Sequence, residues 1–307
     1  MRRLLALAAT LFVVLDLLSA PARAQQAMPT QEEMEEVFKS LHFIEGSFDL
    51  QGGMAGVTLT PDFRALGIVD SQTFLTRLWS NPPEAVEGVL GVIVPVSPHP
   101  LSADGWGVIL SYDSAGYVDD SDAAGIDYDA LMRDMQSSSE ATNEERVAKG
   151  YDPVHVLGWA REPHYDAATK KLFWAKRLRF GDSPDETLNY EIRVLGRRGY
   201  LVLNIVAAMP QFEMVDAKAA ELLSMVHFNQ GNTYAEFDSS VDETAAYGVA
   251  GLIAGGILTK AGFFKGLIAL VIAFKKVIAI GAVGAIAVGY GAVKRFLGRG
   301  KGDGTGA

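Results

Sequence analysis

The sequence contains no cysteine among its 307 residues. Thiol catalysis, disulfide bonds, cysteine-bound metal clusters and a lipid-modified N-terminal cysteine are therefore excluded. A folded segment of roughly 220 residues can bury a sufficient core without disulfide bonds. Any attachment to a membrane must therefore come from the polypeptide itself.

The sequence also lacks the short motifs that mark common active sites. It has neither the Gly-x-Ser-x-Gly nucleophile elbow nor the Gly-x-x-x-x-Gly-Lys-Ser/Thr phosphate loop. No two of its five histidines stand four residues apart, as the zincin motif requires. These absences favour a protein that is not an enzyme, and they predict no cofactor.

Acidic residues dominate the middle of the chain. Residues 25–244 hold 35 of the 37 acidic residues but 16 of the 27 basic ones, a net charge of −19, whereas residues 245–307 carry +7. An acidic surface repels nucleic acid, and a basic apolar tail is attracted to anionic lipid headgroups. The sequence therefore predicts no nucleic-acid partner and a boundary near Thr244.

The first 24 residues predict a secretory signal peptide. Two arginines precede the apolar run 4–18, and Ala22-Arg23-Ala24 forms a small-x-small cleavage site. An uncleaved N-terminal anchor is the alternative, but Asp16 inside the run argues against it. We therefore expect residues 25–46 to form a linker and a short helix at the start of an exported protein.

The apolar C-terminal segment predicts attachment to a membrane. Residues 277–293 carry no charge and would span about 26 Å as a helix, just enough to cross a bilayer. The basic residues in 294–307 place this tail in the cytoplasm and the body, residues 47–244, in the periplasm. Residues 245–274 are apolar and glycine-rich but contain two lysines, so we expect a helical segment at the interface or packed on the anchor. A two-helix hairpin is the alternative. The chain is thus expected at the bacterial inner membrane.

Small residues recur every four positions in this C-terminal segment. The spacing places them on one helix face, where a second helix can approach closely. It predicts self-association or packing against a membrane-protein partner, although a segment this rich in Gly and Ala also produces the spacing by chance. The helix-packing candidates are Gly251, Gly255, Gly262, Gly266, Gly281, Ala285 and Gly289.

The patterns of the body predict an α+β domain. Strands are expected over 89–96 and 105–112. Two strand-turn-strand patterns occupy 153–180 and 186–209, with connections short enough for antiparallel neighbours. Helices are expected over 127–149 and 212–225. Strand pairs followed by a late helix indicate an antiparallel sheet with packed helices.

Three finer features of the body are also expected. Gly52-Gly53 predicts the turn of a hairpin. Asp70-Ser71 predicts the cap of a helix that would run to Trp79. Residues 161–170 predict the turn between the strands of the 153–180 pair.

The acidic loop 113–129 is the candidate metal or catalytic site. Carboxylates are the ligands that calcium prefers, but an alignment with the calcium-loop motif fails at Ala124 and Leu131. We therefore favour a solvated, acidic helix start over a metal site. The weak candidates for metal ligands are Asp120, Asp122, Asp127 and Asp129.

Large aromatic residues are numerous on the expected strands and in the loops beside them. We expect them in the core rather than in a binding groove. Asn204 interrupts an apolar strand, so its amide needs buried partners. The aromatic set is Trp106, Tyr112, Tyr117, Trp159, Tyr165, Phe173, Trp174 and Tyr190.

Several short motifs are spread over nearly all of the mature chain. They include Gly105-Trp106-Gly107-Val108, Gly158-Trp159-Ala160, Trp174-Ala175-Lys176, Phe228-Asn229-Gln230-Gly231-Asn232 and Asp242-Glu243-Thr244-Ala245-Ala246-Tyr247-Gly248. Their combination resembles the DUF2167 family of membrane-anchored bacterial proteins of unknown function. The resemblance implies a signal peptide, an outer domain and a C-terminal membrane segment, and it assigns no catalytic residue. The strands and the late helix also resemble PsbP/Mog1-type sandwiches.

These observations together predict a membrane-anchored periplasmic domain that acts through the bilayer or a protein partner. Two alternatives stay open. One is a periplasmic hydrolase or ligand-binding domain that uses the 113–129 loop with His155 or His164. The other is a C-terminal tail that perturbs the bilayer or forms a pore.

Overall fold

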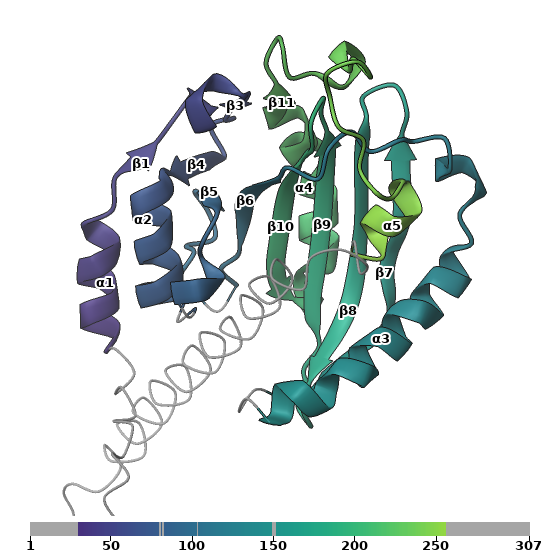
Figure 1. Ribbon diagram of the computed structural model, residues 1–307. Helices are drawn as coiled ribbons and strands as arrows, with labels where there is room; N and C mark the ends of the chain where they lie inside the picture. The colour runs from purple at the N-terminus through teal and green to yellow at the C-terminus, as the bar shows by residue number, and fades with distance from the viewer. Residues whose placement is uncertain (1–29, 80, 82, 103, 149–151, 256–307) are drawn as a thin grey trace, which may run out of the picture.

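The computed structural model describes residues 30–255 except 80, 82, 103 and 149–151. A large antiparallel sheet of eight strands forms the centre of this part (Figure 1). Its strands, in spatial order, are β1 (Phe43–Ile44), β4 (Phe63–Leu66), β5 (Val89–Pro95), β6 (Gly107–Asp113), β10 (Tyr200–Ala208), β9 (Thr187–Leu195), β8 (Lys171–Phe180) and β7 (Val154–Asp166).

A small sheet and several helices surround the large sheet. The small sheet has the order β11 (Val226–Phe228), β3 (Ala55–Thr58) and β2 (Ser47–Leu50). The α-helices are α1 (Gln31–Lys39), α2 (Ile68–Thr73), α3 (Tyr128–Ala148), α4 (Phe212–Met225) and α5 (Val249–Ile253). Shorter helical segments are η1 (Gln51–Gly53), η2 (Phe74–Leu78), η3 (Pro83–Ala85), η4 (Ala123–Gly125), η5 (Met209–Gln211) and η6 (Tyr234–Glu236).

The first face of the large sheet packs against α4 and the small sheet. Ile192 and Leu203 of the sheet share one apolar cluster with Leu222 of α4 and Val57 of β3. Figure 1 shows α4 behind the large sheet and α5 in front of it. These helices therefore cover opposite faces.

The second face carries two separate apolar clusters. One cluster joins α1 and η2 to Val206 of β10 and Leu178 of β8. The other joins α5 to Val202 of β10 and Trp174 of β8. Because each of these two strands contributes to both clusters, the clusters lie at opposite ends of the strands with a gap between them.

Local sequence explains the helices that pack on the sheet. Helix α1 begins with a capping box in which Thr30 and Glu33 satisfy each other's backbone N–H groups. Helix α4 buries Val215, Ala219 and Leu222, whose spacing of four and three residues places them on one face. Burial of such a stripe stabilises a helix more than propensity does.

The expected α+β architecture is confirmed. The helices expected over 127–149 and 212–225 are α3 and α4, and the hairpin expected around Gly52-Gly53 is formed by β2 and β3. The two expected strand pairs are the antiparallel hairpins β7–β8 and β9–β10.

Two predicted boundaries are wrong. Helix α2 begins after Gly67, so Asp70 and Ser71 lie inside it, and the Ser71 hydroxyl donates to the Leu66 carbonyl oxygen at 3.0 Å. Residues 161–166 belong to β7 rather than to a turn. The register of β7 shifts at three places, and β7 is an edge strand, which is where a sheet tolerates a residue such as Pro163.

The predictions for the two chain ends fall largely on residues that the structure does not describe. Within 30–255, apart from the gaps given above, no helix is long and apolar enough to cross a membrane. The expected signal peptide 1–24, transmembrane helix 277–293 and tail 294–307 lie outside the described residues. Most of the expected helical segment 245–274 also lies outside them.

Candidate functional site

The acidic loop 113–129 holds the last described helix in place. Asp122 accepts hydrogen bonds from the backbone N–H groups of Val249 at 2.9 Å and Ala250 at 3.0 Å, which caps α5. A Cβ atom on Gly248 would lie 2.6 Å from the carboxylate of Asp122, so a side chain there would displace this carboxylate from its position at the cap. Helix α5 therefore rests directly on the loop.

Asp120 of the same loop is surrounded by hydrogen-bond donors. Lys170 Nζ and the Tyr165 hydroxyl each donate to its Oδ2 at 2.6 Å, and the Tyr234 hydroxyl donates to its Oδ1 at 3.0 Å. Burial raises the pKa of Asp120, but these hydrogen bonds outweigh it and the net pKa lies below the usual 3.8. Asp120 is thus an ionised acceptor that ties the loop to β7, to the β7–β8 turn and to η6.

A further carboxylate, Asp242, fixes the chain that leads into α5. Its side chain is fully buried and accepts from Arg197 Nε at 2.6 Å and Arg198 Nε at 2.7 Å. The hydrogen bond from Arg197 lowers the pKa of Asp242 to about 2. Tyr117 and Thr244 pair in an isolated parallel bridge. We call residues 242–255 the stem, and we call Asp122, the Asp242–arginine pairs and the Tyr117–Thr244 bridge the stem clamp.

The four candidate metal ligands have separate positions. Asp120 and Asp122 accept the hydrogen bonds described above, and Asp127 accepts from the Ala130 N–H at 2.9 Å at the start of α3. Asp129 lies exposed in the first turn of α3. Within the described part of the chain, no group of three or more His, Cys, Asp or Glu side chains is arranged to hold a metal ion.

The two histidines proposed as partners of the acidic loop have other contacts. His155 Nδ1 lies 2.6 Å from Glu140 Oε1 of α3. The ring of His164 packs against Phe173, with 5.1 Å between ring centroids. Neither contact assembles a catalytic group with the loop.

The aromatic residues divide between core and periphery. Trp106, Trp174 and Tyr190 are buried, which confirms their expected place in the core. Tyr117, a member of the stem clamp, is half-buried and stacks on Phe237 at 3.9 Å between ring centroids.

The described stem contains two of the small residues proposed for helix packing. Gly251 lies in α5, but the helix ends at Ile253 and Gly255 has a φ of +95°. The expectation that this pair shares one continuous helix face is therefore wrong, because a glycine in the left-handed region lies beyond the end of a helix. Gly262, Gly266, Gly281, Ala285 and Gly289 lie outside the described residues, so self-association and bilayer perturbation stay predictions.

A row of polar side chains crosses the second face of the large sheet, in the gap between its two apolar clusters. Glu191 Oε1 accepts from Lys176 Nζ at 2.8 Å, and Oε2 accepts from Arg193. Asn189 Nδ2 donates to Asn204 Oδ1 at 2.9 Å. We call these five residues the polar row. All except Lys176 are at most 4 % exposed.

The polar row is charged in the folded protein. Burial raises the pKa of Glu191, but the charges of Lys176 and Arg193 outweigh it and the net pKa lies below the usual value. Arg193 also lies over the ring of Trp174, with 5.1 Å from its central carbon to the ring centroid. Of the row, sequence analysis identified Asn204 alone, since it interrupts an otherwise apolar strand.

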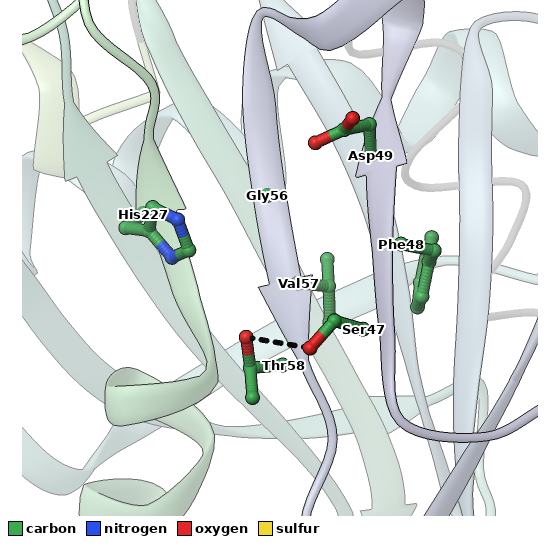
Figure 2. A pocket seen from close by; sticks show the side chains of 7 residues that line it. All are labelled: Ser47, Phe48, Asp49, Gly56, Val57, Thr58 and His227. Atoms are coloured by element: carbon green, nitrogen blue, oxygen red, sulfur yellow. Dashed lines mark hydrogen bonds between the residues drawn. The ribbon is translucent and has the colours of Figure 1, made fainter.

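An open cavity of about 230 Å³ lies on the outer face of the small sheet (Figure 2). One row of directly opposite residues across the three strands is formed by Asp49, Gly56 and His227. The next row on the same face pairs Ser47 with Thr58, and the Ser47 hydroxyl donates to Thr58 Oγ1 at 3.2 Å. A Cβ atom on Gly56 would lie 2.9 Å from His227 Nε2, so this glycine makes room for the imidazole. We call this feature the His227 cavity. It offers a carboxylate, an imidazole and two hydroxyls to a polar ligand.

Comparisons with known proteins identify a family and several distant structural likenesses, including a PsbP and a Mog1 protein. The family model "Protein of unknown function (DUF2167)" matches residues 24–287. Curated proteins give no match. The cyanobacterial PsbP (CyanoP) of Synechocystis sp. PCC 6803 is 9 % identical with a TM-score of 0.34, over 61 % of this chain and 92 % of that one. The Ran-binding protein Mog1p of Saccharomyces cerevisiae is 11 % identical with a TM-score of 0.32, over 62 % and 96 %. Likenesses at this level indicate no shared function.

Proposed function

The chain belongs to the DUF2167 family, whose function is unknown, and we propose that it is an exported domain held at the bacterial inner membrane by its C-terminal apolar segment. In this proposal the described domain lies in the periplasm and acts through a protein or membrane partner. The signal-peptide pattern of residues 1–24 and the apolar run 277–293 support the two ends of the assignment.

The stem clamp is the observation that carries the proposal. A chain segment near the end of a domain is ordinarily poorly ordered unless contacts tie it down. Here Val249, Leu252 and Ile253 of α5 are buried against the large sheet, and Asp122, from a distant part of the sequence, caps the helix. Such anchoring suits a stem that connects the domain firmly to a membrane segment.

Charge supports the same arrangement. The body carries −19 and the C-terminal segment +7, so anionic headgroups attract the segment and repel the domain. The domain would stand away from the bilayer while the segment inserts. The His227 cavity lies on the other side of the large sheet from α5, so a tether at α5 leaves it accessible to a partner.

Fractionation of two versions of the protein tests the tether. The full chain is expected in carbonate-washed membranes, and a version that ends at Gly255 is expected free in the periplasm. A full-length variant with His227→Ala serves as the control and is expected to stay in the membrane. Recovery of the full-length protein from the cytosol, with Met1 retained and without detergent, would contradict the proposal.

Photo-crosslinking in living cells tests the partner. A photoreactive residue in place of Thr58 lies at the His227 cavity, whereas one in place of Asp182 lies at an exposed position of the β8–β9 turn. We expect a discrete adduct from the first position and none from the second. A protein that gives no adduct from either position and that purifies as a monomer would contradict a role through a partner.

A further inference from the structure

Three buried N–H groups lie close together on the second face of the large sheet without an acceptor among the described residues. They are Trp174 Nε1, Arg193 Nε and Asn204 Nδ2. Their residues are 1 %, 4 % and 1 % exposed. A buried donor without a partner is ordinarily destabilising and rare in folded proteins, so three in one place require an explanation.

The register of the sheet makes these donors neighbours. Trp174 and Asn204 stand directly opposite Glu191, on either side of it. Arg193 is the next residue of β9 on the same face, since side chains of a strand alternate between faces. Side chains at directly opposite and diagonal positions of adjacent strands lie within reach of one another. One bound group can therefore meet more than one of the donors.

The site also has an excess of positive charge, so both its unpaired donors and its charge favour an anionic ligand. Lys176 and Arg193 face one carboxylate, Glu191, and each of its oxygens already accepts from one of them. One positive charge is left without a counter-charge in the row. Asp113, further along β6, accepts from the Tyr200 hydroxyl at 2.8 Å and belongs to a different contact.

We propose that the polar row, together with Trp174, is a binding site for an oxyanion, a carboxylate or phosphate group of a small molecule or a lipid headgroup. Such a group supplies both missing properties: several acceptor oxygens and a negative charge. Arg193 Nε and Asn204 Nδ2 donate to the ligand, and Lys176 supplies the balancing charge. The Lys176 side chain keeps 17 % of its surface exposed, so the row has a connection to solvent.

Buried water is the competing occupant. Water oxygens can accept from all three donors, as buried water commonly does for unsatisfied polar groups. Water does not balance the charge, however, so a site filled by water predicts no response to anions at fixed ionic strength. The two occupants are therefore separable by experiment, and the result does not depend on the membrane tether.

Thermal unfolding of the full-length protein in a non-ionic detergent provides the test. Sodium phosphate, sodium acetate and a short-chain phosphatidylglycerol are each compared with sodium chloride at equal ionic strength and pH. We expect a saturable rise in Tm of about 5–10 °C at a hundredfold excess over Kd for at least one of the three. The ligand that gives it identifies a free phosphate, a carboxylate or a lipid headgroup as the source.

Two tryptophan variants provide a matched pair. Trp174→Phe removes one donor from the site and keeps a ring in the core, and it is expected to weaken binding of the effective anion about tenfold. Trp106→Phe removes an equally buried, equally unpartnered indole N–H, but on the first face of the sheet, and it is expected to leave binding unchanged.

Lys176→Met serves as a second variant that keeps Arg193 and Glu191 paired. It removes the excess charge, and we expect the anion-dependent rise in Tm to disappear. The proposal is overturned if no anion raises the Tm of the wild-type protein. It is also overturned if Trp106→Phe weakens binding as much as Trp174→Phe, or if a crystal structure in phosphate shows only water at the three donors.

Discussion

The two faces of strand β9 are both buried but have opposite chemistry. Ile192 points into the apolar cluster shared with α4, whereas its neighbours Glu191 and Arg193 point into the polar row. The apolar face therefore forms one continuous core. The polar face divides its apolar side chains into two clusters, and the stem clamp sits beside only one of them. The first face thus packs one apolar core against α4 and the small sheet, whereas the second face holds buried charges and the packing site of α5.

The largest effect is expected from the centre of the polar row. Glu191→Ala leaves Lys176 and Arg193 without their shared counter-charge, and removal of one partner from a buried ion pair costs about 3–5 kcal/mol. Glu186→Ala breaks the more exposed pair with Arg177 and is expected to cost at most about 1 kcal/mol. Denaturant unfolding of both variants checks the difference. Equal losses of unfolding free energy in the two variants would show that burial of the polar row does not strengthen its ion pairs.

A smaller effect is expected at the pair of amides. Asn204→Leu alone leaves the Asn189 amide without its acceptor and is expected to cost about 1–3 kcal/mol. The double variant Asn189→Leu/Asn204→Leu removes both partners and should recover most of this loss. Unfolding free energies of the single and double variants form a double-mutant cycle. If the losses of unfolding free energy in the two single variants simply add in the double variant, the two amides are not coupled.

On the apolar face, the volume-conserving change Leu203→Met is expected to cost less than about 1.5 kcal/mol.

A local effect is expected at the stem clamp. Asp122→Ala removes the acceptor for the first N–H groups of α5, and loss of such a cap costs about 0.5–2 kcal/mol. Hydrogen exchange at the amides of Val249 and Ala250 should therefore accelerate. Asp119→Ala, in the same loop, removes hydrogen bonds to the adjacent Ser121 and is expected to leave these amides unchanged. The same exchange rates in both variants would mean that Asp122 does not hold α5.

The smallest effect is a dependence on pH. The pKa of Asp242 is lowered from 3.8 to about 2 by Arg197, so its contribution to stability is complete above 3.8 and is lost as the pH falls toward 2. Protease sensitivity of the stem should rise over this range in the wild-type protein. In Asp242→Asn the rise should be weaker, because the titrating carboxyl is gone. An unchanged pH profile in the variant would contradict the role of Asp242.

The sequence was sufficient to predict the hairpins and the main helices because their signals are local. The strand-turn-strand pattern of 186–209 predicted β9 and β10, and the helix expected over 127–149 is α3. The stem clamp had no such signal, since Asp122 and Val249 are 127 residues apart. In the fold, Asp127 accepts a hydrogen bond at the start of α3, as a helix-start pattern predicts, whereas Asp120 and Asp122 accept from distant parts of the chain.

The polar row was missed for a different reason. Asn189, Glu191 and Arg193 alternate with apolar residues, and this pattern is typical of a strand with one face in solvent. Period-two alternation reports two chemically different faces and does not report which of them is buried. Asn204 was noticed because a polar residue within an apolar run stands out. Its cross-strand neighbour Glu191 gave no comparable signal.

Protease accessibility in spheroplasts tests the central assignment of an exported, C-terminally tethered domain most directly. The full-length protein, with a short epitope after Ala307, is exposed to protease before and after the inner membrane is permeabilised. We predict that the described domain is digested in intact spheroplasts while the epitope stays protected until permeabilisation. Protection of the domain together with the epitope in intact spheroplasts would contradict the account.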